Sequence, residues 1–176
     1  MHDDPLTRYL LDRLAECGMP DRFYGWVTTL DRDGRGLPPD AAEHYTLTGE
    51  DVKAAWEAAG LKATGSGKAR KGTLVHPRWR LSSSLHSMRG SNFLEVTMNL
   101  QVGKELGGSL IHSLAADLMK RSGRALPDPP FPRPWAYAVT DVQWYAERVA
   151  ELLRDVALAC DVAGPPDGNA VDGSDR

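Results

Sequence analysis

The clearest pattern along this chain is an alternation of apolar and polar residues over positions 94–102. The apolar positions are Leu94, Val96, Met98, Leu100 and Val102, and the polar ones between them are Glu95, Thr97, Asn99 and Gln101. Successive side chains of a strand point to opposite sides, so the pattern predicts a strand over 92–102. One face of that strand is expected to be buried, and the other to meet water or a ligand.

Two weaker patterns predict further strands. Residues 73–81 are rich in β-forming side chains, although Pro77 favours an edge position or a bulge. Residues 22–30 are rich in aromatic and β-branched side chains, which also favours a strand. An antiparallel hairpin of 73–81 with 92–102 would place Trp79 in the core and set Arg78 or Arg80 opposite Glu95.

Apolar residues at helical spacing predict four helices, over 6–17, 48–60, 107–122 and 140–160. Thr48 is a typical N-cap residue, Gly60 is expected to end that helix, and Gly107-Gly108 are expected to open the third one. Few strands without regular β-α-β alternation favour an α+β fold. We expect one domain over 1–162, with a mainly antiparallel sheet of three to four strands covered on one side by about four helices. The Gly-, Pro-, Asp- and Asn-rich tail, 163–176, is expected to be disordered.

Composition is that of an ordinary soluble globular protein, with 176 residues and a formal net charge of -3. No apolar run approaches the ~20 residues that span a bilayer, and the first residues do not form a secretory signal. We therefore expect a cytoplasmic protein without a membrane partner, and the abundance of Arg, Ala, Gly and Asp suggests a bacterial source. Cys17 and Cys160 are expected to be reduced, buried thiols.

Charge is distributed unevenly. Seven basic residues and no acidic residue lie between positions 58 and 94, whereas the chain as a whole is acidic. Such a block attracts anions through its local field. The residues predicted to bind are His76, Arg78, Arg80, His86, Arg89, Lys68, Arg70 and Lys71.

No motif predicts catalysis, a metal or a cofactor. The chain lacks the glycine-rich phosphate-binding motifs, the Gly-x-Ser-x-Gly nucleophile motif and histidines at metal-ligand spacing. His112 is expected on the polar side of its helix. The leading hypothesis is a small binding protein, of adaptor, inhibitor or immunity type, that engages an acidic protein partner. The alternatives are a nucleic-acid-binding protein that uses the same block, and an enzyme acting on a phosphate- or carboxylate-bearing small molecule. The oligomeric state is left open.

Overall fold

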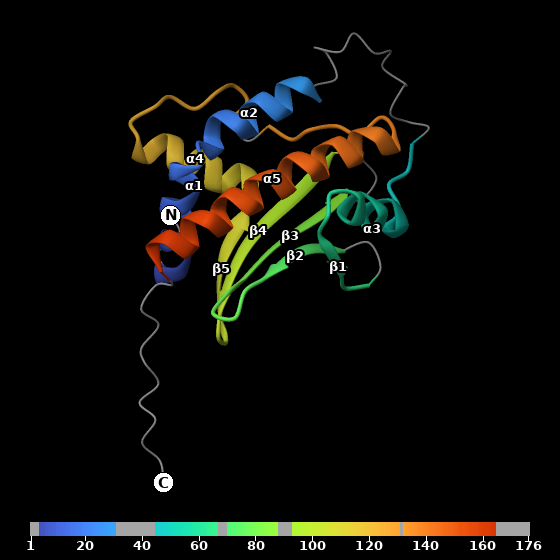
Figure 1. Cartoon of the computed structure of the whole chain (residues 1–176). Helices are drawn as coiled ribbons and strands as arrows, with labels where there is room; N and C mark the ends of the chain where they lie inside the picture. Colours follow the sequence, from blue (N-terminus) through green and yellow to red (C-terminus); the bar gives the residue numbers. More distant parts are fainter. Residues whose placement is uncertain (1–3, 31–44, 67–69, 88–92, 131, 165–176) are drawn as a thin grey trace.

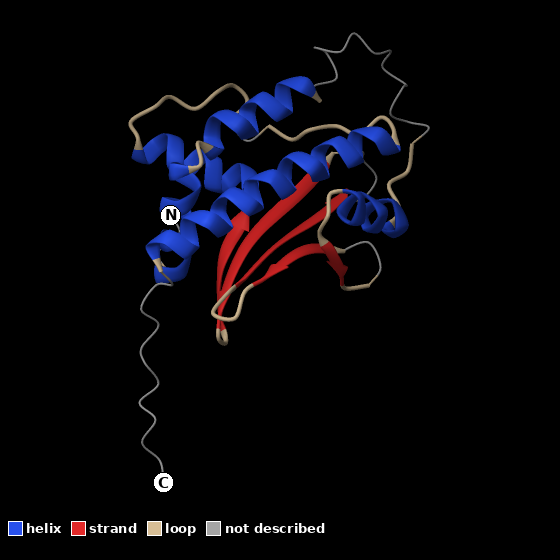
Figure 2. Ribbon diagram, viewed as in Figure 1, coloured by secondary structure: helices blue, strands red, loops and turns tan. Residues whose placement is uncertain are grey.

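The computed structural model describes residues 4–30, 45–66, 70–87, 93–130 and 132–164. Within these residues the chain forms one sheet of five strands, which lie side by side in chain order, each antiparallel to the next (Figures 1 and 2). The strands are β1 (Lys62–Thr64), β2 (Lys71–Val75), β3 (Arg80–Ser87), β4 (Leu94–Val102) and β5 (Glu105–Leu110).

Helices cover one face of this sheet, and no described helix lies over the other face (Figures 1 and 2). They are α1 (Pro5–Glu16), α2 (Met19–Thr29), α3 (Gly49–Ala58), α4 (Ile111–Arg121) and α5 (Val139–Ala163). The α+β class and the one-sided covering are thus confirmed. The described part of the chain has five strands and five helices, somewhat more than the three to four strands and about four helices predicted. Strands β1 and β5, helix α2, and all but the first two residues of β3 were not foreseen.

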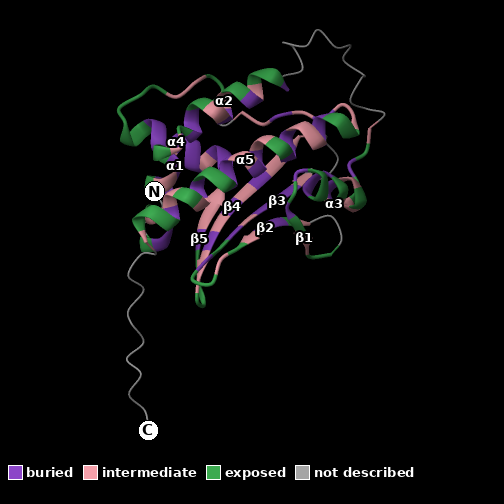
Figure 3. Ribbon diagram, in the orientation of Figure 1, coloured by how far each residue is buried: buried purple, intermediate pink, exposed green. Residues whose placement is uncertain are grey.

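The core lies between the helices and the sheet (Figure 3). The alternation in β4 is confirmed: its apolar side chains face the helices, whereas Thr97 and Asn99 face away. The same alternation in β3 buries Leu81 and Leu85 against the helix layer. The largest fully buried side chains of that layer are Trp56, Tyr145 and Phe23.

The strand predicted over 22–30 is wrong, because this segment is helix α2. Gly18 takes a left-handed conformation (φ 64°), and Pro20 follows in the first turn of the helix, where proline is tolerated. Phe23 and Trp26 are three residues apart and both are buried, which is the spacing of one helix face. Tertiary packing thus overrides a β propensity that is only a weak guide.

The range 73–81, predicted as one strand, holds most of β2, a turn, and only the first two residues of β3, which continues to Ser87. The backbone N–H of His76 donates to the carbonyl of Trp79 at 2.9 Å and closes that turn between β2 and β3. Trp79 is buried at 6% exposure, as predicted, but Val75, predicted on the buried face, is 67% exposed. The predicted pairing of Arg78 or Arg80 with Glu95 is also wrong: Arg80 pairs with Gln101, and His86 lies opposite Glu95.

Gly107 and Gly108 lie in β5 rather than at a helix start, and α4 begins at Ile111. A Cβ atom on Gly107 would lie 2.6 Å from the backbone nitrogen of Thr7, so this glycine allows α1 to pack closely on the sheet. The Thr7 hydroxyl accepts a hydrogen bond from the N–H of Gly108 at 2.8 Å. Helix α1 is therefore tied to the backbone of β5.

Three smaller predictions have separate outcomes. His112 is not a surface residue: it is 6% exposed, and burial lowers the pKa of its imidazole, as does nearby Arg133. Both cysteines are free thiols, but only Cys160 is buried as predicted, whereas Cys17 is half-buried. Burial raises the pKa of both thiols. Most of the tail that was predicted to be disordered, 163–176, lies outside the described residues; within them, Ala163 is the last residue of α5 and Gly164 follows it.

Candidate binding face

The sheet face that points away from the helices is polar over most of its area. The strand register determines which side chains lie on this face, because residues that pair across strands share a face. In strand order the main side chains of this open face are Lys62, Thr64, Lys71, Thr73, Val75, Arg80, Ser82, Ser84, Thr97, Asn99, Gln101 and Leu106. We call this surface the open face.

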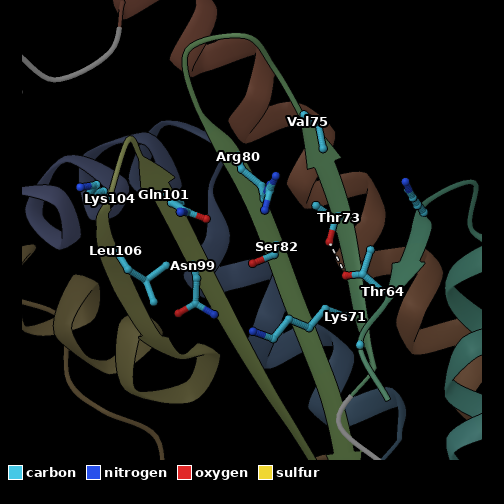
Figure 4. A pocket seen from close by; sticks show the side chains of 12 residues that line it. Thr64, Lys71, Thr73, Val75, Arg80, Ser82, Asn99, Gln101, Lys104 and Leu106 are labelled. Atoms are coloured by element: carbon cyan, nitrogen blue, oxygen red, sulfur yellow. Dashed lines mark hydrogen bonds between the residues drawn. The ribbon is translucent and has the colours of Figure 1, made fainter. Parts of the chain in front are cut away.

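A hollow of about 540 Å³ lies on the open face, and Lys104 from the β4–β5 turn joins its rim. Its lining comes from all five strands, so the sheet itself forms the floor (Figure 4). The side chain of Lys71 reaches across β3 in the direction of Asn99, and that of Arg80 points along β3 in the direction of Ser82 (Figure 4). The two cationic groups therefore approach the middle of the hollow from different strands.

The positive charge around the hollow has no counterion among the described residues. In the part of the chain that the structure describes, no carboxylate lies within 4.0 Å of Lys62, Lys71, Arg80 or Lys104. Glu95 lies at the far end of the face, and its oxygens are taken by His86 at 3.3 Å and by Arg133 at 3.1 Å. Within the described residues, the hollow is consequently a site of positive charge that no carboxylate neutralises.

Hydrogen bonds hold the floor of the hollow in place. The hydroxyl oxygens of Thr64 and Thr73, which line the hollow, are 3.2 Å apart, and those of Ser84 and Thr97, which lie beside it on the open face, are 2.6 Å apart. The side-chain amide of Asn99 donates to the Thr97 hydroxyl at 3.1 Å. Side chains fixed in this way lose less rotational freedom when a ligand binds than free ones do.

The predicted residues His76 and Arg78 lie in the β2–β3 turn, beside the hollow rather than in it. The His76 ring stacks on Trp79 with a centroid separation of 4.7 Å, and its Nδ1 accepts from the backbone N–H of Arg78 at 3.2 Å. Its Nε2 lies 3.5 Å from a carboxylate oxygen of Asp161 in α5. These residues border a second hollow of about 220 Å³, which adjoins the first at Arg80.

The other predicted residues separate into three groups. Arg70 is held by Glu50 at 2.6 Å and donates to the carbonyl of Gly65 at 3.3 Å, so its charge is already compensated. His86 is occupied by Glu95 as described above, whereas Lys71 lies in the hollow. Lys68 and Arg89 lie outside the described residues.

Several lining residues were missed as site residues. Lys62 belongs to the cationic block, but the sequence did not distinguish it from its neighbours. Asn99 and Gln101 were placed on the wet or ligand-facing side of their strand by alternation alone. Lys104 gave no signal, since only the β4–β5 turn brings it beside β3.

The chemistry of the lining favours binding over catalysis. The hollow contains no histidine, carboxylate or thiol among its described lining residues, and these groups supply most general acids and bases. None of the described residues that line the hollow has an aromatic ring on which a nucleic-acid base could stack. No set of three or more His, Cys, Asp or Glu side chains suited to a metal ion occurs in the described ranges.

Comparisons of the chain with protein-family models, with curated proteins and with solved structures found no match. Of the helices that the structure describes, none combines the length and apolar character needed to cross a membrane.

Proposed function

We propose that this protein is a binding protein that holds an acidic segment of a protein partner against its open face. The observation that carries the proposal is the set of basic side chains around the hollow, Lys62, Lys71, Arg80 and Lys104, which have no carboxylate partner in the described part of the chain. Carboxylates of a partner would neutralise these side chains and accept charge-assisted hydrogen bonds from them.

The surroundings of the cations support a polypeptide ligand. The floor between Lys71 and Arg80 offers hydroxyl and amide groups, which suit the polar backbone and side chains of a peptide. The described lining residues provide no aromatic ring for base stacking, and this disfavours the nucleic-acid alternative. The same described residues include neither a carboxylate–histidine pair nor a thiol, and this disfavours the enzyme alternative.

The test uses two fluorescein-labelled peptides, one of alternating Glu and Ser and one of alternating Lys and Ser, in fluorescence anisotropy titrations. The protein is expected to bind the Glu peptide and to ignore the Lys peptide. Added salt should weaken binding, because exposed charges are screened.

The decisive variant is Lys71→Gln/Arg80→Gln, since both side chains are exposed and carry no structural ion pair to a described residue. Each exposed pair is worth roughly 0.2–1 kcal/mol, so we expect the double variant to bind about tenfold more weakly. Lys120→Gln, at an exposed position in α4, is the matched control and should bind like the wild type. Equal affinity of all three proteins for the Glu peptide would overturn the proposal, as would tighter binding of a single-stranded RNA of the same length.

A further inference from the structure

Two exposed apolar side chains border the hollow at the end nearest the β2–β3 turn. Among the described residues five large apolar side chains are exposed, and two of these, Val75 (67%) and Leu106 (65%), lie on the open face. Scattered exposed apolar residues need no explanation. The position of these two relative to the charges is what distinguishes them.

The strand register places both residues in one row with a cation between them. Val75 pairs with Arg80, Arg80 pairs with Gln101, and Gln101 pairs with Leu106. Directly paired residues share a face, so the row runs from β2 to β5 as apolar, cationic, amide and apolar. Lys104, two residues before Leu106, adds a second cation at that end of the hollow.

The length of this row matches an extended peptide. Neighbouring strands are about 4.8 Å apart, so three spacings separate Val75 from Leu106 by roughly 14 Å. In an extended chain that rises about 3.3 Å per residue, side chains four residues apart are roughly 13 Å apart and point to the same side. The side chain midway between them also points to that side and would meet Arg80.

We infer that the acidic segment recognised by this protein is amphipathic and extended, with the pattern apolar–x–acidic–x–apolar, and that it lies across the strands. Its two apolar side chains contact Val75 and Leu106, and its carboxylate contacts Arg80. This inference rests on the proposed function and adds the sequence pattern that the open face selects.

The experiment compares two labelled peptides of identical composition by fluorescence anisotropy. One has the core Leu-Ser-Glu-Ser-Leu, and the other has the core Leu-Leu-Ser-Ser-Glu. The first is expected to bind about tenfold more tightly, because only its spacing lets both leucines lose water contact while the carboxylate reaches Arg80. Equal affinity for the two peptides would overturn the inference.

Protein variants then assign the advantage to the row. In Val75→Thr/Leu106→Gln the advantage of the first peptide should disappear, whereas Leu158→Gln should retain it. Leu158 is 66% exposed on α5, so this control removes a comparable apolar side chain away from the open face. An advantage that persists in the double variant would also refute the inference. The variant Arg80→Gln separates this inference from the proposed function. If only the inference is wrong, the variant should still bind both peptides more weakly than the wild type. If the proposed function is wrong, the variant should bind both peptides as the wild type does.

Discussion

A substitution at Gly107 tests how closely α1 packs on the sheet. An added Cβ would lie 2.6 Å from the Thr7 nitrogen and 2.7 Å from the Leu6 carbonyl carbon, whereas ordinary contact begins at 3.4 Å. Both are backbone atoms of a helix, which cannot rotate aside as the tip of a side chain can. In Gly107→Ala, α1 must therefore move outward by several tenths of an ångström.

The expected cost follows from what that movement disturbs. Helix α1 buries Leu6, Leu10, Leu11 and Leu14 against the core. Overpacking of this kind typically costs 1–3 kcal/mol, so the free energy of unfolding should fall by about 2 kcal/mol. For a chain of this size, that corresponds to a decrease in melting temperature of roughly 4–8 °C.

The assay is urea denaturation of Gly107→Ala beside Gly25→Ala. Gly25 lies inside α2, and no neighbouring atom lies within 4 Å of the place that an added Cβ would take, so alanine there should stabilise the protein by about 0.5–1 kcal/mol. The two variants make the same chemical change, but the free energy of unfolding is expected to fall in Gly107→Ala and to rise in Gly25→Ala. If Gly107→Ala were as stable as the wild type or more stable, the close approach of α1 to β5 would be refuted.

Two further predictions concern buried polar groups. Thr7→Val keeps the shape of the side chain but leaves the Gly108 N–H without its acceptor. The free energy of unfolding, measured by urea denaturation, should fall by about 1–3 kcal/mol. An unchanged denaturation midpoint would contradict that hydrogen bond. Burial, and secondarily Arg133, lower the pKa of His112 in the folded state, so the unfolded chain takes up this proton first as pH falls below about 6.5. The free energy of unfolding should therefore decrease as the pH falls through that range, and this decrease should be smaller in His112→Gln. Identical pH profiles of the wild type and the variant would count against a buried neutral imidazole.

Alternation predicted the part of the fold that depends on local pattern. Strand β4 has nine residues with one buried face, so any single-residue shift would expose its apolar side chains. Helix α2 shows where composition misleads, because Phe23 and Trp26 favour a strand by type and a helix by spacing. The β2–β3 turn at His76 interrupts a segment whose composition favours one continuous strand.

The candidate site was predicted only as a region of charge. Arg70 and Lys71 are adjacent in sequence and equivalent in composition, yet Glu50, twenty positions earlier, neutralises only Arg70. Which cations remain unpaired depends on strand register and on such distant partners, and neither follows from one sequence. The position of Lys104 at the hollow also depends on strand pairing, because the turn between the paired strands β4 and β5 brings it there.

The most direct test of the binding face is an NMR titration of the ¹⁵N-labelled protein with the Leu-Ser-Glu-Ser-Leu peptide. Amide shifts should change in the strands that form the hollow, including Thr73, Ser82 and Asn99, and should stay constant in α2 and α4. Shift changes confined to the helices, or none at peptide concentrations that saturate anisotropy, would contradict the assignment of the open face as the binding surface.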